Sequence, residues 1–262
     1  MLPITEASPL SRRRVRIGSM VVGGSRPVLI AGPCAVEPGY VDQAISCAEA
    51  GIDALRACVF KPRTRPDSFQ GMGAAALPLL AEARHRTGLP LLSEVLALED
   101  AEMLGEHVDG FQVGARNMQN FRLLEALGEI GRPVILKRGL AATIDEWVAA
   151  SEYIRRRGND DVVLCERGIR TFEPRTRNTL DLNAVLVAQE LTDLPVIVDP
   201  SHAAGNRDWV PALGKAALAV GADGLLVEAH PVPSLAWTDS AQAIGLDELS
   251  GLASAAAAAE AL

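Results

Sequence analysis

Eight short apolar segments with strand character recur along this chain, and a helix-like segment follows each of them. The centres of these segments are rich in Val, Ile and Leu, which is the composition of strands buried on both faces of a parallel sheet. A strict alternation of strand and helix predicts an α/β fold built on such a sheet. The strand-like segments are residues 28–34, 53–63, 89–94, 109–116, 133–138, 161–167, 194–202 and 222–228.

The helix-like segments carry start and stop signals of the expected kind. Thr143 stands three residues before Glu146 in the pattern of a capping box, and glycines such as Gly88 and Gly131 follow the ends of other segments. The segments are residues 41–50, 74–86, 98–106, 118–130, 143–157, 183–191, 209–220 and 246–262.

Eight strand–helix pairs without a break in composition predict one (β/α)8 TIM barrel over residues 28–262. The length of 262 residues agrees with the roughly 250 residues that such a barrel usually takes. A doubly wound open sheet is the rival fold. It would normally show a glycine-rich dinucleotide turn after the first strand, and the sequence GPCAVEPG at residues 32–39 does not match that pattern.

Residues 1–27 are predicted to form an N-terminal extension of the barrel. The sequence RVRIGSMVVGG at residues 14–24 has the pattern of a short hairpin that turns at Gly18 and Ser19. Such a hairpin could close the N-terminal end of the barrel. No segment outside the barrel resembles an appended regulatory domain, so feedback control is expected only from a separate partner protein.

The net charge and the distribution of apolar residues disfavour binding to nucleic acid, insertion into a membrane and secretion. The formal net charge of −8 argues against nucleic-acid binding, which usually requires a basic surface. No apolar stretch approaches the roughly 20 residues that cross a bilayer. The three arginines at residues 12–14 are not followed by the apolar core of a secretory signal. A cytoplasmic protein without a membrane partner is therefore expected.

The four cysteines show no CxxC pair and are expected to remain thiols. Cys47, Cys58 and Cys165 lie in helix-like or strand-like segments and are predicted to be buried as small apolar residues. Cys34 differs, because it follows Gly32 and Pro33 beyond the end of its strand, where a core thiol would be misplaced.

Several residues that could hold a metal ion lie at or just beyond strand ends. In a parallel barrel all these ends meet at one mouth, so Cys34, His202 and Glu228 are expected to converge there with Asp239. A thiolate, an imidazole and two carboxylates suit one divalent ion such as Mn, Fe, Co or Zn better than Mg. Of the other histidines, two are expected at the surface (His85 and His107), and the role of His230 is left open.

Cationic residues are also concentrated at the strand ends. Lysine and arginine in apolar surroundings are costly without anionic partners, and the few carboxylates there are needed for the metal. The excess positive charge therefore predicts a ligand with more than one phosphate or carboxylate group. The residues are Arg56, Lys61, Arg63, Arg116, Lys137 and Arg167, whereas Arg138, Arg170 and Arg175 are expected to form salt bridges around the rim.

These positions lie within longer strings that resemble the 3-deoxy-D-arabino-heptulosonate 7-phosphate (DAHP) synthases, in particular the short microbial type related to the octulosonate-phosphate synthases. The resemblance runs from about residue 15 to the end of the chain. The strings are GPC (32–34), FKPRT (60–64), SFQGMG (68–73), QVGARNMQN (112–120), LKRG (136–139), CERGIRTFE (165–173), DPSHAAG (199–205) and ADGLLVEAHP (222–231).

The resemblance implies a (β/α)8 transferase that condenses phosphoenolpyruvate with erythrose 4-phosphate, the first step of the shikimate pathway. It also implies that the ion polarises the acceptor's carbonyl and that Lys61, His202 or a metal-bound water donates a proton to the new alkoxide. The residues implied are Cys34, His202, Glu228 and Asp239 for the metal, Arg56, Lys61, Glu94, Ala115, Arg116, Lys137 and Arg167 for phosphoenolpyruvate, and Pro62, Arg63 and Thr64 for the aldose phosphate.

The acceptor segment discriminates between the two related enzymes. Octulosonate-phosphate synthases carry Asn after the lysine and Ser after the arginine, and some lack the metal cysteine. This chain has Lys61-Pro-Arg-Thr together with Cys34, which favours the heptulosonate enzyme. The set of four metal ligands also favours an enzyme over a barrel that has kept only a binding role.

Three segments depart from the usual family pattern. Ala57-Cys58 replaces two glycines, residues 35–38 read AVEP instead of SVES, and residues 238–242 read TDSAQ instead of SDGPQ. The last segment contains Asp239, and its altered sequence puts the shape of this metal-binding loop in doubt. These changes leave room for a different acceptor sugar, so a related synthase that uses another phosphorylated aldose remains the alternative. Members of the family are commonly dimers or tetramers, so a homodimer or homotetramer is expected.

Overall fold

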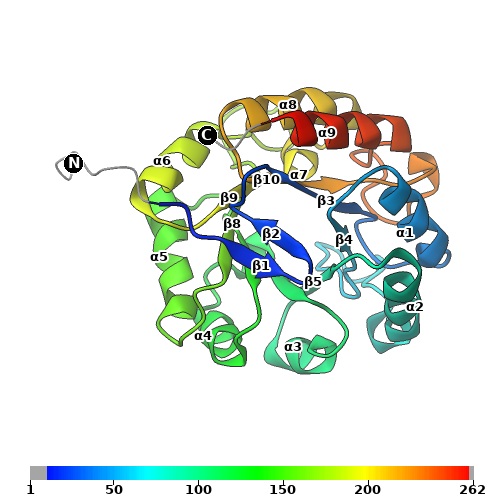
Figure 1. Cartoon of the computed structure of the whole chain (residues 1–262), viewed down its shortest axis with the longest axis horizontal. Helices are drawn as coiled ribbons and strands as arrows, with labels where there is room; N and C mark the ends of the chain where they lie inside the picture. Colours follow the sequence, from blue (N-terminus) through cyan, green and yellow to red (C-terminus); the bar gives the residue numbers. More distant parts are fainter. Residues whose placement is uncertain (1–10, 260–262) are drawn as a thin grey trace.

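The computed structural model describes residues 11–259 and shows a closed barrel of eight parallel strands surrounded by helices (Figure 1). The last strand pairs with the first strand of the barrel as well as with its predecessor, so the sheet has no open edge. The predicted (β/α)8 fold is confirmed, and the open doubly wound sheet is excluded. The strands are β3 (Val28–Gly32), β4 (Ala54–Arg56), β5 (Leu91–Val95), β6 (Gly110–Val113), β7 (Val134–Lys137), β8 (Val162–Glu166), β9 (Val196–Val198) and β10 (Gly224–Glu228).

Each predicted helical segment overlaps with one helix of the outer ring (Figure 1). The capping box at Thr143 and Glu146 forms as expected. Within residues 11–259, no helix has the length and apolar character that crossing a bilayer would require. The helices of the ring are α1 (Tyr40–Glu49), α2 (Leu77–Thr87), α3 (Leu98–Leu104), α4 (Phe121–Ile130), α5 (Ile144–Arg155), α6 (Asn183–Leu191), α8 (Val210–Ala219) and α9 (Leu246–Ala258).

Short helices in the connections were not predicted as separate elements. The most important is α7 (Pro200–Ala204), which begins directly after β9 because the carboxylate of Asp199 accepts a hydrogen bond from the backbone N–H of His202. The other four are 3-10 helices, namely η1 (Gly73–Ala76), η2 (Ala115–Asn117), η3 (Arg207–Trp209) and η4 (Pro233–Leu235).

Side chains alternate between the two faces of the barrel wall, as the geometry of a strand requires. One set, which includes Leu55, Phe111 and Leu136, packs outward against the helices. The other set points into the barrel and forms a second, smaller apolar cluster. Its strand residues are Val28, Ile30, Ala54, Leu92, Ile135, Val163, Cys165, Ile197 and Leu226.

The predicted N-terminal hairpin is present as β1 (Val15–Ile17) and β2 (Met20–Val22), which pair antiparallel through a turn at Gly18 and Ser19. Four of its five apolar side chains are buried in the inner cluster of the barrel. The hairpin lies in front of the barrel strands in Figure 1, and Gly18 approaches Pro90 and Asp109, which directly precede β5 and β6. It therefore closes the N-terminal end of the barrel, as predicted.

The predicted division of the chain at residues 27 and 28 stays a prediction. The first ten residues of the extension and the last three of the barrel segment lie outside the described residues. The three cysteines expected in the core (Cys47, Cys58 and Cys165) are buried free thiols.

The hairpin should contribute to stability through its inward face alone. Replacing the fully buried Ile17 with alanine is expected to lower the free energy of unfolding by about 2–4 kcal/mol, because it leaves a cavity in the inner cluster. The matched control is Arg16→Ala on the exposed face of the same strand, which should change stability by less than about 0.5 kcal/mol. Denaturant titration of both variants measures the difference, and equal effects would contradict the role of the hairpin.

Candidate active site at the C-terminal mouth of the barrel

The inward-facing columns of side chains change from apolar to charged at the C-terminal end of the barrel. On several strands the next inward position after an apolar residue carries a buried charged group. Because all strands are parallel, these groups meet around a single mouth. They are Arg56 after Ala54, Glu94 after Leu92, Lys137 after Ile135, Asp199 after Ile197 and Glu228 after Leu226.

The four predicted metal ligands come together at this mouth. One ligand atom from each of Cys34, His202, Glu228 and Asp239 lies within 4.8 Å of the others. The Nε2 atom of His202 is 3.1 Å from Oε1 of Glu228, and Sγ of Cys34 is 3.2 Å from Oδ2 of Asp239. The Oε1 atom of Glu228 is buried and accepts no hydrogen bond within the described part of the chain. This donor set therefore fits a borderline divalent ion.

Asp199 orients the imidazole of His202. Its Oδ2 atom is 2.7 Å from Nδ1 of His202 and accepts a hydrogen bond of 2.6 Å from Nζ of Lys137. The other ring nitrogen, Nε2, is thereby turned toward Glu228. Burial alone would raise the pKa of Asp199, but the adjacent His202 and Lys137 lower it well below its usual range.

The protonation of His202 suits a metal ligand. Burial lowers the pKa of its imidazole to about 4, despite the opposing effect of Asp199 and Glu228. The ring is therefore neutral at pH 7. A carboxylate that holds the far nitrogen of a ligating histidine is a common arrangement in metal sites, since it fixes both the tautomer and the ring orientation.

Two cations lie against the cluster. The Nζ atom of Lys61 is 2.7 Å from Oδ2 of Asp239 and also contacts Sγ of Cys34, while NH1 of Arg56 is 3.2 Å from Oε1 of Glu228. Burial raises the pKa of the Cys34 thiol well above its usual value, with Glu228 adding to the effect. The thiol is thus protonated at neutral pH in the protein without an ion, and metal binding would release its proton.

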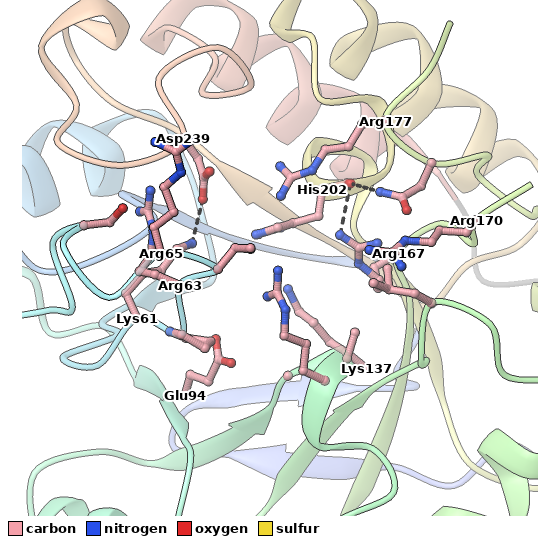
Figure 2. A pocket seen from close by; sticks show the side chains of 18 residues that line it. Lys61, Arg63, Arg65, Glu94, Lys137, Arg167, Arg170, Arg177, His202 and Asp239 are labelled. Carbon is pink, nitrogen blue, oxygen red and sulfur yellow. Dashed lines mark hydrogen bonds and ion pairs between the residues drawn. The ribbon is translucent and has the colours of Figure 1, made fainter. Parts of the chain in front are cut away.

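A cavity of about 480 Å³ opens beside the cluster and is surrounded by long cationic side chains (Figure 2). The wall includes most residues predicted for the two substrates, whereas Arg56 lies buried outside it. The predicted residues in the wall are Lys61, Pro62, Arg63, Thr64, Glu94, Ala115, Arg116, Lys137, Arg167, His202 and Asp239.

Several residues of the wall were not predicted from the sequence. They are Arg65, Ser68, Gly114, Leu140, Arg170, Arg177 and Asn178. With the three additional arginines, the wall carries eight Lys or Arg side chains but only two carboxylates. This excess matches a ligand, or a pair of ligands, with several negative charges, because forked guanidinium groups bind phosphate and carboxylate oxygens well.

The expected rim salt bridges form only in part. Arg138 pairs with Glu166 at 3.0 Å and with Asp181 at 2.9 Å, as predicted. For Arg170 and Arg175 the prediction was wrong, since neither forms a salt bridge within residues 11–259. Arg170 points into the cavity instead (Figure 2).

The remaining histidines differ in their surroundings. His85 is exposed and His107 is half-buried, while His230, whose role was left open, is buried next to Glu37.

Asp199, which orients His202, was not among the site residues predicted from the sequence. Its signal was present, because Asp199 follows the inward-facing Ile197 by two residues at the end of a strand.

Comparison with known proteins gives the same family as the resemblance found in the sequence. Residues 3–261 match the model of the DAHP synthetase I family. The chain belongs to this family. The expected resemblance and the expected class of enzyme are therefore confirmed.

Individual relatives separate the two related enzymes. The chain is 45% identical over 235 residues to a phospho-2-dehydro-3-deoxyheptonate aldolase of Thermotoga maritima, covering 89% of this chain and 70% of the relative. It is 32% identical to a 2-dehydro-3-deoxyphosphooctonate aldolase of Syntrophotalea carbinolica, covering 90% and 91%. A crystal structure of DAHP synthase from T. maritima superposes with a TM-score of 0.89 at 43% identity, covering 93% of this chain and 72% of that one. The similarity is thus greater to the heptulosonate enzyme.

The contact between Asp199 and His202 leads to a prediction for metal affinity. Asp199→Asn is expected to weaken binding of Mn²⁺ by about 10–100-fold, because the amide no longer holds the imidazole in one tautomer and orientation. The control is Asp181→Asn, which removes a carboxylate paired with Arg138 outside the barrel and should leave Mn²⁺ affinity unchanged. Calorimetric titration of both variants is the measurement, and an unaltered affinity in Asp199→Asn would contradict the prediction.

Proposed function

We propose that this protein catalyses a metal-dependent condensation of phosphoenolpyruvate with D-erythrose 4-phosphate and water. The products are 3-deoxy-D-arabino-heptulosonate 7-phosphate and inorganic phosphate. The main support is the position of the Cys34, His202, Glu228 and Asp239 cluster at one side of a strongly cationic cavity. This space has room for a carbonyl activated by the metal ion and for a donor that carries two anionic groups, a phosphate and a carboxylate.

The phosphoenolpyruvate site is proposed on the side of the cavity formed by three successive strands. Arg116 follows β6, Lys137 ends β7 and Arg167 follows β8, and all three line the cavity. Their charges would hold the phosphate and carboxylate of phosphoenolpyruvate. Glu94 lines the same cavity, whereas Arg56 lies buried outside it and pairs with Glu228. Binding in one orientation brings the enol carbon toward the acceptor's aldehyde, which lowers the entropic part of the barrier.

The position of Arg167 is fixed by its neighbours. Its NH2 group donates a hydrogen bond of 3.1 Å to the carbonyl of His202, and the adjacent Gly168 N–H donates one of 2.6 Å to Glu166. Glu166 is in turn paired with Arg138. These contacts hold Arg167 in position at this side of the proposed site.

The acceptor sugar is assigned to the segment Pro62, Arg63 and Thr64. These residues line the cavity, and Arg63 lies on the same side of it as Asp239, across from Lys137 and Arg167 (Figure 2). The NH1 group of Arg63 is buried and has no hydrogen-bond partner among the described residues, so it is available for the phosphate of the sugar. A donor of this kind gains most from an anionic acceptor.

Cys34, His202, Glu228 and Asp239 would hold one divalent ion, which would act as a Lewis acid on the acceptor's carbonyl. We assign Lys61 the role of proton donor to the new alkoxide. Its Nζ atom lies beside Asp239 and Cys34. Burial alone would lower the pKa of Lys61, but the nearby Cys34, Glu228 and Asp239 raise it. His202 is the second candidate for this proton transfer. Because its imidazole is neutral at pH 7, it is a weaker proton donor than the charged Lys61, so we prefer Lys61.

The ion is proposed to be Mn, Fe, Co or Zn, in keeping with the mixed sulfur, nitrogen and oxygen donors. A cytoplasmic location agrees with four free thiols in the described residues. A homodimer or homotetramer is proposed on the resemblance to the family. A related synthase with another phosphorylated aldose is the second candidate, favoured by the altered residues 238–242 next to the metal cluster.

The choice of acceptor sugar can be measured directly. With Mn²⁺ and phosphoenolpyruvate, we expect rapid release of inorganic phosphate when erythrose 4-phosphate is added, and release at least about tenfold slower with arabinose 5-phosphate. A panel of four-, five- and six-carbon aldose phosphates provides the comparison. Rapid release with a five-carbon sugar and none with erythrose 4-phosphate would instead support the second candidate.

The metal assignment can be tested at Cys34. Cys34→Ala should lose turnover and bind Mn²⁺ at least about 100-fold more weakly, because a direct ligand should matter more than the outer contacts that cost about 10–100-fold. Cys47→Ala, in helix α1 away from the mouth, is the control and should keep both properties. Treatment with a chelator should likewise abolish the activity of the unaltered protein, and added Mn²⁺ should restore it. Full activity of Cys34→Ala would show that the ligand set is wrong.

A further inference from the structure

Two of the four proposed metal ligands are carried by loops rather than by strand ends. Cys34 lies in the loop between β3 and α1, and Asp239 lies in the loop between β10 and α9. Asp239 also has a φ of 52°, which is a left-handed backbone conformation that costs energy in a residue other than glycine. Surrounding contacts must therefore hold this residue in place.

The carboxylate of Glu37 joins these two loops. Glu37 is only 2% exposed and accepts three hydrogen bonds within the described residues. Its Oε1 atom is 3.1 Å from Nε2 of Gln43 and 3.2 Å from Nε2 of His230, and its Oε2 atom is 2.9 Å from the backbone N of Trp237. Glu37 is three residues after Cys34, and Trp237 is two residues before Asp239.

His230 uses both of its ring nitrogens in this arrangement. Its Nδ1 atom accepts a hydrogen bond of 2.9 Å from the backbone N–H of Val232, so the proton of the neutral ring is on Nε2 and faces Glu37. We call the group of Glu37, His230 and the backbone N–H groups of Val232 and Trp237 the clasp. It spans most of the loop that leads from Glu228 to Asp239.

A third loop meets the clasp. The ring of Trp237 packs edge-to-face against Phe69, with centroids 5.3 Å apart, and Phe69 follows the proposed acceptor segment. Lys61, at the start of that segment, pairs with Asp239 at 2.7 Å. The clasp therefore supports the loop that carries Asp239. The same loop contacts the segment from Lys61 to Phe69, which includes the proposed acceptor residues.

We propose that Glu37 is a positioning residue that sets Asp239 against Cys34 for metal binding. Both carboxylate oxygens of Glu37 are occupied by N–H donors, so it does not itself serve as a ligand. It acts by holding the backbone at Trp237 and, through His230, the earlier part of the same loop. This inference rests on the proposed function, because it needs the four-residue cluster to bind a divalent ion.

The first test is metal affinity in Glu37→Gln. An amide has one oxygen acceptor in place of two, and its NH₂ group would face N–H donors, so at least one hydrogen bond of the clasp is lost. The Kd for Mn²⁺, measured by calorimetry, is expected to rise about 10–100-fold. The Kd for phosphoenolpyruvate in the metal-free protein should not change, since its proposed ligands on β6, β7 and β8 do not touch the clasp.

Gln43→Ala provides the matched control. It removes one of the three donors to Glu37 but leaves both connections to the loop that carries Asp239, so Mn²⁺ affinity should be unchanged. His230→Gln is a second variant of the clasp, in case Glu37→Gln does not fold. It should weaken Mn²⁺ binding because the contact with the Val232 N–H is lost.

A double variant separates positioning from a general loss of stability. If Glu37 acts through Asp239, then Glu37→Gln combined with Asp239→Asn should bind Mn²⁺ within about twofold of Asp239→Asn alone. Losses that multiply in the double variant would overturn the inference. So would a parallel loss of phosphoenolpyruvate affinity in Glu37→Gln, which would indicate a general disturbance of the mouth.

The same measurements distinguish this inference from the proposed function. If the unaltered protein binds Mn²⁺ and Glu37→Gln binds it equally well, only the role of the clasp is wrong. If the unaltered protein binds none of Mn²⁺, Fe²⁺, Co²⁺ and Zn²⁺, both the proposed metal site and the clasp's role in it are wrong.

Discussion

In the inward-facing positions of the barrel, buried charged residues follow the apolar core residues by two positions along the chain. The rest of the site depends on how these charges are balanced. Arg56 and Glu228 are almost completely buried and lie 3.2 Å apart, while Lys137 and Asp199 form a second buried pair at 2.6 Å. Removing one partner of such a pair leaves an unpaired buried charge and is strongly destabilising. The pairs therefore fix the relative positions of four strand ends, and His202 is held between the two carboxylates.

Most of the fold and the strand-borne part of the site could be predicted because they follow from periodicity. The alternation of strands and helices defines a parallel barrel, and parallel strands bring residues such as Lys137 and Glu228 to one mouth whatever their separation in sequence. The inner cluster also explains why the short hairpin around Gly18 was recognisable, since its alternating apolar residues fill the bottom of the barrel. These features depend on local pattern and on the closure of the sheet.

The loop-borne part of the site was less accessible from the sequence. Arg170 and Arg177 lie in the long connection after β8, where no periodicity indicates direction, and Arg170 was expected in a salt bridge. His230 likewise has no interpretable pattern, because its partner Glu37 is 193 residues away in sequence. Contacts of this kind depend on how two loops meet across the mouth, and a single sequence carries no direct signal for that.

The division between strand-borne and loop-borne groups also bears on where specificity can change. The proposed phosphoenolpyruvate residues are held by β6, β7 and β8 and by buried ion pairs, so a change in a surface loop would disturb them little. Asp239 is different, because its loop touches the acceptor side through Lys61 and through the contact of Trp237 with Phe69. With the proposed site residues, the unusual residues around Asp239 are therefore expected to affect the fit of the acceptor sugar more than that of phosphoenolpyruvate. A barrel built in this way can alter its acceptor while keeping its donor.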